Sequence, residues 1–505
     1  MLRRAAVVRT AAGRGDVAHA SHQFTGPSLP PTTVGIVPSP VTTAVLPHSR
    51  RPAAGSVVVV GAGLAGAQTV AALRAHGFTG VVTVLGAEGV PPYDRPPLSK
   101  ELFSRATPAW LSEEIGVDVT VLADEALLDD PAVALEPSTE AVAVTTRSGR
   151  RVTADVAVLA LGSEPVRPPG WETALTLHTA DDAAHLRGRL TPGARLVSIG
   201  AGWIGAEVAG VASEAGCEVT VLEAAQTPLE RQLGAEVGSH LVRWYADAGV
   251  RLLTGSQVTE VGARSVVLAD GRTVEGDLVL AAVGARPATA WLTGTLPLDP
   301  RGSIRVNAAG RVAPPTVATP SGTSGHLPLK ALRRLYAVGD CATRDSAVFG
   351  PVPGGHWSAA LHDPEPTVRA ILGIDEMPAE PQPVRELLGL APVPQHAPYV
   401  FSQQLGHDIA LFGTPSPFHE VVYRGDPSGG ATGHEGWTAL YLETVAGVHR
   451  TNAEGHRLAT VRAVLVVDAP REVGQVRKLM NRDVALHVDV EVATDPGRRL
   501  RDAVV

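Results

Sequence analysis

Two short apolar runs, each rich in β-branched residues, lead directly into a glycine-rich turn and then into an alanine-rich stretch. The first copy runs from Val57 to Gly66 and the second from Leu196 to Gly205. A further run follows each copy at a similar offset, at Val81–Leu85 and Glu218–Leu222. Continuous apolar runs bounded by glycine are typical of strands buried in a parallel sheet, and the stretch between them has helical character. The pattern therefore predicts two βαβ units, an internal repeat of a nucleotide-binding domain.

Each unit is closed by a comparable hairpin and strand. A turn at Ser148-Gly149 leads to the run from Val156, and a turn at Asp270-Gly271 leads to the run from Leu278. Leu335–Asp340 reads as a further strand that ends in an acid. From about residue 386 the pattern changes to short strands and turns, which predicts a third domain of α+β type, while the Pro/Thr/Ser/Gly-rich stretch 311–329 predicts a surface loop whose function stays open.

Composition narrows the choice of function. The chain has 505 residues, of which 44% are hydrophobic and 19% charged, so it has enough apolar residues for large cores. Its net charge of -8 argues against general nucleic-acid binding, and its most apolar stretch, 57–67, is far shorter than the roughly 18 residues that a membrane span needs. Residues 1–55 hold one acid, Asp16, and read as a disordered extension, a wrong start codon or a transit peptide.

The two cysteines, Cys217 and Cys341, exclude a disulfide framework and a cysteine-based zinc site. Histidines such as His362 and His407 have no convincing metal-ligand companions, so we expect no metal. A reducing compartment fits this cysteine usage, and only three of the 43 basic residues are lysine, which indicates a GC-rich genome. We therefore expect a bacterial cytoplasmic protein. We take a monomer or a weak dimer as the working expectation, although nothing in the sequence indicates the oligomeric state.

Both turns have the pattern G-x-G-x-x-G. The first glycine permits the tight turn, the second lets the backbone approach a pyrophosphate, and the third allows close packing of strand and helix. Glycine-rich turns without a ligand are the alternative interpretation. The six glycines are Gly61, Gly63 and Gly66 in the first copy, and Gly200, Gly202 and Gly205 in the second.

The acid after the second strand distinguishes the two copies. Glu223 directly follows Leu222, where a carboxylate can accept hydrogen bonds from an adenosine ribose and repel a 2′-phosphate, so NADH is favoured over NADPH. In the first copy the matching position is Gly86, and the nearest acid is Glu88. A surface acid without a role is the alternative for Glu88.

The segment Pro91–Leu102 resembles the signature of the FAD-dependent ferredoxin reductases that supply electrons to bacterial oxygenases and are related to apoptosis-inducing factor. The resemblance spans about residues 56 to 480 and includes Gly284, Tyr336–Asp340 and His356-Trp357. It implies an α/β fold with a discontinuous FAD-binding domain at 56–165 and 285–385, an inserted NAD-binding domain at 166–284, and a C-terminal interface domain at 386–505. Electrons would pass from NADH through FAD to a ferredoxin or rubredoxin.

The resemblance also implies roles for individual residues. Arg95 and Lys100 bring cations to an anionic cofactor, Asp340 binds the ribityl chain of FAD, and we expect Lys100 to pair with Glu207 at the hydride-accepting edge of the flavin. Trp357 would stack near the flavin or conduct the outgoing electron, although an ordinary core tryptophan is the alternative. The expected FAD set is Gly61, Gly63, Gly66, Glu88, Arg95, Lys100, Asp340 and Trp357, and the expected NADH set is Gly200, Gly202, Gly205, Glu223 and Gly284.

Some positions depart from the family pattern. Gly355 stands where an acid is frequent, Gln403 replaces an aspartate, and Tyr399 and Phe401 replace tryptophans. No cysteine lies in Pro91–Lys100, where related disulfide reductases carry a redox pair, so the electrons must leave for an external acceptor. An NADH oxidase, a quinone- or nitrite-linked reductase, and a redox-dependent interaction protein similar to apoptosis-inducing factor stay open as alternatives.

Overall fold

The structure is a computed structural model that describes residues 54–314, 327–374, 396–428, 436–443 and 450–505. The predicted N-terminal extension lies outside this part except for residues 54 and 55, and so do most of the 311–329 loop and the first ten residues of the predicted third domain. Among the helices of the described residues, none has the length and apolar character needed to span a membrane.

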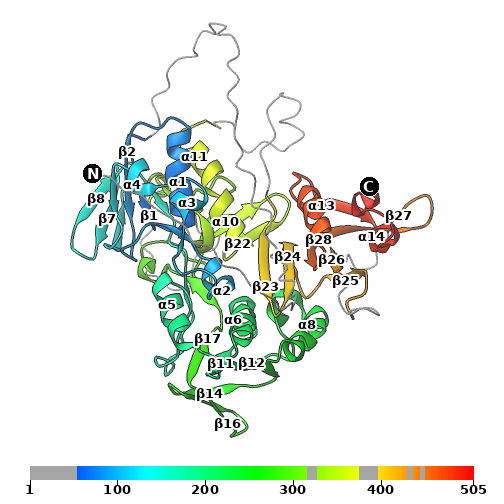
Figure 1. The fold of residues 1–505 in the computed structure, drawn as a ribbon. Coiled ribbons are helices and arrows are strands. Elements are labelled where there is room, and N and C mark those ends of the chain that lie inside the picture. Colours follow the sequence, from blue (N-terminus) through cyan, green and yellow to red (C-terminus); the bar gives the residue numbers. More distant parts are fainter. Residues whose placement is uncertain (1–53, 315–326, 375–395, 429–435, 444–449) are drawn as a thin grey trace, which may run out of the picture. The chain divides into compact units, whose positions relative to one another are not determined.

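The first predicted βαβ unit is present and belongs to a five-stranded parallel sheet, here called the first sheet, with the order β20-β9-β1-β2-β5 (Figure 1). Within it, Val57 pairs with Val82 and Val156 in register. Its elements are β1 (Ser56–Val60), α1 (Leu64–Ala75), β2 (Val81–Leu85), β5 (Glu125–Leu127), β9 (Val156–Leu159) and β20 (Leu335–Ala337).

Alternate residues of β1 build different cores on the two faces of the first sheet. Val57 and Val59 pack with α1 and α11, whereas Val58 and Val60 pack towards a three-stranded antiparallel sheet. This small sheet contains the predicted hairpin, and α11 follows a short α10. The elements are β6 (Ala132–Pro137), β7 (Val142–Thr146), β8 (Arg151–Ala154), α10 (Trp357–His362) and α11 (Pro364–Ile371).

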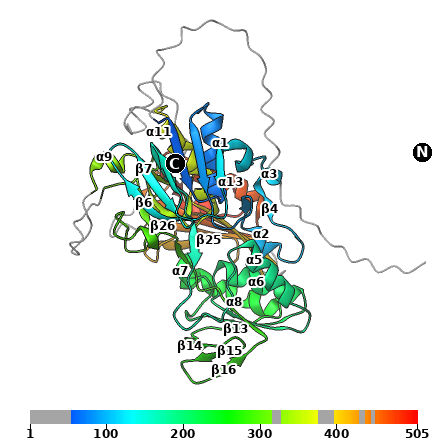
Figure 2. The ribbon, with the colours of Figure 1, turned by 90° about the vertical axis from the view of Figure 1, so that its left-hand side faces the viewer.

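The second unit repeats this layered arrangement in the second sheet, a four-stranded parallel sheet with the order β13-β12-β11-β17. Leu196 faces the helices, and Val197 and Ile199 face the three-stranded sheet β14–β15–β16. Figures 1 and 2 both show α6 and α8 on one side of this sheet and β14–β16 on the other. The elements are α5 (Ala180–Arg189), β11 (Arg195–Ile199), α6 (Trp203–Glu214), β12 (Glu218–Leu222), α8 (Ala235–Asp247), β13 (Arg251–Leu253), β14 (Val258–Val261), β15 (Ser265–Leu268), β16 (Thr273–Glu275) and β17 (Leu278–Ala281).

Two short antiparallel strands, β10 (Ser163–Pro165) and β18 (Ala285–Pro287), run side by side where the chain passes between the first and second sheets. Ser163 pairs with Pro287 and Pro165 with Ala285. Two short elements carry the proline-rich motif, β3 (Tyr93–Asp94) and α2 (Pro97–Lys100).

The third sheet is antiparallel and has the main order β23-β24-β28-β26-β25. Both of its faces are covered by other elements. One face, including Leu411 and Tyr441, shares an apolar core with α6 and α8, so this sheet is joined to the second unit. The other face, including Phe412 and Val464, packs against α13 and the C-terminal segment. The elements are β23 (Tyr399–Gln404), β24 (His407–Gly413), β25 (Glu420–Arg424), β26 (Trp437–Glu443), β28 (Arg457–Val467) and α13 (Pro470–Met480).

The predicted α/β fold class is confirmed. Three further elements follow α13: β29 (Leu486–Asp489), which pairs with β28, α14 (Val490–Thr494) and η3 (Leu500–Ala503). They are needed because they cover the apolar face of the third sheet with buried side chains such as Val488 and Leu500.

Candidate functional site

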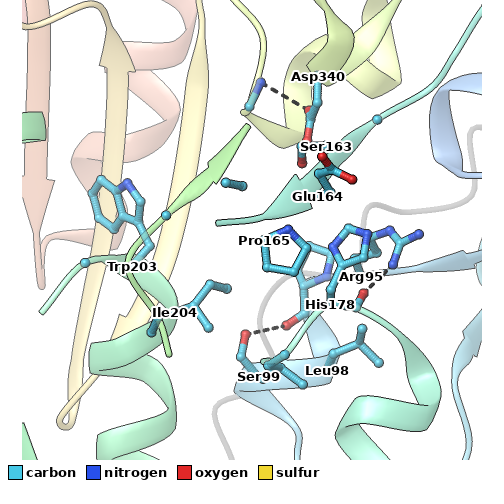
Figure 3. A pocket seen from close by; sticks show the side chains of 18 of the residues that line it. Arg95, Leu98, Ser99, Ser163, Glu164, Pro165, His178, Trp203, Ile204 and Asp340 are labelled. Atoms are coloured by element: carbon cyan, nitrogen blue, oxygen red, sulfur yellow. Dashed lines mark hydrogen bonds between the residues drawn. The ribbon is translucent and has the colours of Figure 1, made fainter. Parts of the chain in front are cut away.

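A large cavity of about 1380 Å³ lies where the two glycine turns, the proline-rich motif and the end of β23 meet. Ordinary small-molecule pockets measure about 300–1,000 Å³, so this cavity has room for an extended ligand or for two ligands that meet. Figure 3 shows Asp340 and Ser163 towards one end, Leu98 and Ser99 towards the other, and Pro165, His178 and Arg95 between them.

The first cradle, defined as the turn that carries Gly61, Gly63 and Gly66, has the geometry that an anion site needs. A Cβ on Gly61 would lie 2.1 Å from the carbonyl oxygen of Ala160, and one on Gly66 would lie 1.9 Å from that of Gly61. A Cβ on Gly63 would meet nothing within 4 Å, because this residue faces the cavity. No side chain caps the N-terminus of α1 and its first turn holds no acid, so its N–H groups are available to a phosphate.

The second cradle, defined as the turn that carries Gly200, Gly202 and Gly205, repeats this arrangement. A Cβ on Gly200 would lie 2.4 Å from the carbonyl oxygen of Ala282, and one on Gly205 would lie 2.0 Å from that of Gly200. Gly202 faces open cavity, and α6 also begins without a side-chain cap or an acid. Both cradles therefore fit a pyrophosphate, since the glycine nearest the ligand leaves free space and uncapped N–H groups.

Glu223 lies at the end of β12, as predicted, and lines the cavity. Its carboxylate accepts backbone N–H groups from Ala201 at 2.7 Å and from Ala225 at 2.8 Å. These two bonds fix the carboxylate beside the second cradle and leave lone pairs for a ribose hydroxyl.

Glu88 and Arg95 also line the cavity, but the structure brings them to each other. The guanidinium of Arg95 donates to Glu88 and to the carbonyl oxygen of His178, and the hydroxyl of Tyr93 donates to the other Glu88 oxygen. Tyr93 in turn accepts the N–H of Ala180 at 2.9 Å. Burial raises the pKa of Tyr93 well above its ordinary value, so the hydroxyl keeps its proton. Arg95 thus pairs with a carboxylate that the sequence analysis had assigned separately, and its contact with an anionic cofactor stays a prediction.

The predicted Lys100–Glu207 ion pair is present, with 2.8 Å between Lys100 Nζ and Glu207 Oε1. The Lys100 side chain is 11% exposed and the Glu207 side chain 2%. Ser99, next to Lys100 on α2, donates to the second oxygen of Glu207, and the ammonium of Lys100 lies 4.8 Å from the ring centre of Phe401. Both charged groups line the cavity into which the two cradles open.

Asp340 follows β20 in a short 3₁₀ turn, η2 (Gly339–Cys341), and lines the cavity at the end away from Ser99 (Figure 3). Its carboxylate accepts the hydroxyl of Ser163 at 3.0 Å and the N–H of Gly355 at 3.2 Å. Burial raises the pKa of Asp340, and these two donors act in the opposite direction.

Trp357 begins α10, as predicted, and its indole N–H donates to Asp94 at 2.9 Å. Its ring meets Phe401 edge to face, with 5.8 Å between ring centres. Before it, His356 caps the helix by accepting the N–H of Ala359 through Nδ1, while its Nε2 is buried without a partner among the described residues. Burial lowers the pKa of His356 to about 4, so the ring is neutral at pH 7.

Several cavity residues were not singled out from the sequence. Tyr93, Asp94 and Ser99 belong to the proline-rich motif, so the signal for them was the motif itself. His178 has no signal in the sequence, and its side chain lines the cavity while its backbone carbonyl accepts from Arg95 (Figure 3). Ser402 does not itself line the cavity, but it donates to Glu207, which does. Gly284 and all other predicted cofactor residues except Gly66 and Gly205, which lie behind the turns, line the cavity.

His456, Asp489 and Glu491 form a cluster whose ligand atoms lie within 4.8 Å of one another. Asp489 already accepts bonds from Asn452, His456 and the N–H of Val492, and Glu491 accepts the N–H of Arg457. These donors stabilise the turn before β28 and the start of α14, which explains the cluster as a structural one.

A family model described as pyridine nucleotide-disulphide oxidoreductase matches residues 55–362. Among curated proteins, the ferredoxin–NAD(+) reductase component of the anthranilate 1,2-dioxygenase system of Burkholderia cepacia is 30% identical over 395 residues, which cover 74% of this chain and 85% of that protein.

Two solved structures are also similar. The crystal structure of Fdr9 has 32% sequence identity and a TM-score of 0.69, with 88% of this chain and 99% of that chain covered. The covalent putidaredoxin reductase–putidaredoxin complex has 25% identity and a TM-score of 0.72, with 89% and 97% covered.

Proposed function

The chain belongs to the pyridine nucleotide-disulphide oxidoreductase family, and we propose that it is an FAD-dependent reductase that transfers electrons from NADH to a ferredoxin-type iron–sulfur protein serving an oxygenase. The observation that carries the proposal is that two matching phosphate cradles open into one cavity, which the Lys100–Glu207 pair also lines. This arrangement suits two dinucleotides that meet at their reactive ends.

The first cradle is assigned to FAD and the second to NADH. Gly61, Gly63 and the start of α1 would bind the FAD pyrophosphate, Glu88 would serve the adenosine ribose, and Asp340 would serve the ribityl chain. The second cradle would bind the NADH pyrophosphate, and Glu223 would accept from the ribose hydroxyls. A carboxylate fixed at this place by two backbone N–H groups would repel the 2′-phosphate of NADPH.

FAD, when bound, accepts two electrons as a hydride from NADH and can return them singly, which suits a one-electron iron–sulfur acceptor. The chain's own residues would bind the two nucleotides, orient them and shield them from water. Lys100 would present a cation to the ligands in the cavity, Glu207 holds that cation, and Asp94 fixes the indole of Trp357 through its hydrogen bond. Trp357 and Phe401 then form an aromatic wall of the cavity.

An external acceptor is supported by the state of the cysteines. Cys217 and Cys341 are the two cysteines of the chain, both are buried, and neither lines the cavity. Burial raises the pKa of Cys341 to about 12, so its thiol is not an available nucleophile. A dithiol relay within this chain is therefore not part of the proposal.

Anaerobic electron transfer tests the proposal. The FAD-loaded protein would be mixed with NADH and an oxidised [2Fe–2S] ferredoxin from an oxygenase system, with cytochrome c as the final acceptor. We expect cytochrome c reduction that depends on ferredoxin and is faster with NADH than with NADPH. Brisk oxygen consumption without any ferredoxin-dependent rate would instead assign the protein to the oxidases.

We also propose that the protein acts in the bacterial cytoplasm, where NADH is produced. Cell fractionation would test this location.

A further inference from the structure

Two segments far from α6 in the sequence surround one buried carboxylate, Glu207 on α6. The proline-rich motif supplies Ser99 and Lys100, and β23 of the third sheet supplies Ser402. Ser402 and Lys100 both donate to Oε1, and Ser99 donates to Oε2. Ser99 and Ser402 are 1% and 2% exposed, so water does not replace either hydroxyl.

The proton of Ser402 has a fixed direction. An ionised carboxylate can only accept, so the single hydroxyl proton of Ser402 is directed at Glu207. Gln404, which is also 2% exposed, donates its amide N–H to the Ser402 oxygen at 2.9 Å. The amide therefore occupies the acceptor side of the hydroxyl and leaves its proton for Glu207.

The packing of α6 against the β23–β24 turn explains why Ser402 can reach Glu207. Gly210 lies one helical turn after Glu207, and a Cβ there would lie 2.9 Å from the backbone nitrogen of Leu405. The missing side chain lets the helix and the hairpin approach at backbone distance. Leu405 itself has a φ of 53°, a conformation that non-glycine residues adopt only where the surroundings impose it.

We propose that Ser402 is a positioning residue for hydride transfer: together with Ser99 it holds the Glu207 carboxylate in one orientation, and Glu207 thereby fixes Lys100 in the cavity that both cradles share. Neither serine needs to touch a nucleotide for this role. The inference rests on the proposed function, because it names what the Lys100–Glu207 pair is held for.

The two serines can orient Glu207 because they and Lys100 all donate to lone pairs of the same carboxylate. A carboxylate with three charge-assisted donors in fixed places has little freedom to rotate. Without Ser402, Lys100 is the one donor of these three that still contacts Oε1. Lys100 would then be drawn toward Glu207 and away from the cavity. Loss of a hydroxyl donor leaves the net charge unchanged but stabilises the negative charge of Glu207 less, which would lower the midpoint potential of an FAD bound in the cavity.

The test compares the wild-type protein with Ser402→Ala and Ser99→Ala, all FAD-loaded, in anaerobic stopped-flow mixing with NADH. We expect hydride transfer at saturating NADH to slow by about tenfold in each variant, with a nearly unchanged Kd for NADH. The FAD midpoint potential, measured without NADH, should fall in both. Ser99 reaches the other oxygen of Glu207, so Ser99→Ala carries the test even where Ser402→Ala does not fold.

Ser198→Ala is the matched control. Ser198 is fully buried on β11, and its hydroxyl has no hydrogen-bond partner among the described residues. Its rate and midpoint potential should equal those of the wild type. The inference is overturned if Ser402→Ala reduces FAD within about twofold of the wild-type rate at an unchanged potential, or if the control slows it equally.

Gln404→Met separates positioning from general loosening of the hairpin. The variant should slow hydride transfer by about threefold in the wild-type background and by nothing further in Ser402→Ala, because Gln404 acts only through the Ser402 hydroxyl. If the rate losses of Gln404→Met and Ser402→Ala multiply in the double variant, Gln404 does not act through Ser402. A wild-type protein that NADH does not reduce at all would instead refute the proposed function, which keeps the two failures distinct.

Discussion

The two cradles share their glycine geometry but differ in how they hold their acids. In the second unit, backbone N–H groups of the unit itself fix Glu223 at the end of β12. In the first unit, the matching residue is Gly86, where a Cβ would lie 2.9 Å from the carbonyl oxygen of Leu128, and the acid Glu88 is held by Tyr93 and Arg95 from the proline-rich motif. In the proposed assignment, the repeated glycine turns bind the two pyrophosphates, and the residues at the strand ends select which dinucleotide binds at each turn.

The largest expected effect separates the two cradles by their middle glycines. Gly63→Val should weaken FAD binding at least about a thousandfold, because the new side chain fills the space that a pyrophosphate needs. Gly202→Val should retain FAD and weaken NADH binding by a similar factor. Visible flavin absorption and anaerobic NADH titration measure the two effects.

Gly188→Val on α5 is the control for these valine variants, since a Cβ there also meets nothing within 4 Å and the residue lies outside the cavity. It should bind both nucleotides as the wild type does. A Gly63→Val protein that purifies with a full complement of FAD would contradict the assignment of the first cradle.

The second prediction concerns the acids. Glu223→Gln keeps one acceptor oxygen but removes the charge, so the preference of kcat/KM for NADH over NADPH should fall by about tenfold to a hundredfold. Glu88→Gln should leave this preference unchanged and affect FAD binding alone. Steady-state kinetics with both nucleotides measure the ratio, and an unaltered preference in Glu223→Gln would show that another residue discriminates the 2′-phosphate.

The third prediction is a pH dependence that belongs to the first unit. The folded protein holds His356 neutral until its lowered pKa of about 4, whereas the unfolded chain takes up a proton near 6.5. The unfolded state therefore binds more protons between these values, and stability is lost as the pH falls through this window, by about 2–3 kcal/mol at pH 4.

His356→Asn tests this, because asparagine also caps helices but does not titrate. The Tm of the variant should fall less between pH 6.5 and pH 4 than that of the wild type. The variant should still lose some Tm over this range, because burial also lowers the pKa of His362 to about 4. Parallel Tm profiles for the two proteins would exclude His356 as a source of acid sensitivity.

The smallest effect is expected from Tyr93→Phe. The variant loses the hydroxyl that donates to Glu88 and accepts the N–H of Ala180, so the free energy of unfolding should fall by about 1 kcal/mol. FAD binding should weaken severalfold, while NADH preference stays unchanged. Urea unfolding and FAD titration measure the two quantities, and a change in NADH preference would show that the acids of the two units are coupled.

Much of the fold followed from local pattern. The βαβ units, the hairpin turns at Gly149 and Gly271 and the position of Asp340 after its strand are set by residues close in sequence, so periodicity and turn chemistry predicted them. The Lys100–Glu207 pair links two distant segments and was predicted only through family resemblance.

The remaining features depend on tertiary contacts. A serine in a strand carries no signal of its own, so the role of Ser402 follows only from the approach of β23 to α6 at Gly210. The pairing of Glu88 with Arg95 was missed for a related reason: each charge was assigned to the cofactor separately, although a carboxylate and a guanidinium seven residues apart can satisfy each other.

The central claim is that NADH reduces an FAD bound in the first cradle. Anaerobic titration of the purified protein with NADH, followed by visible absorption and with NADPH as the control, tests it most directly. The account predicts that stoichiometric NADH bleaches the flavin band and that NADPH does so far less effectively. A protein that cannot be reconstituted with FAD, or whose flavin NADPH reduces as readily as NADH, would contradict it.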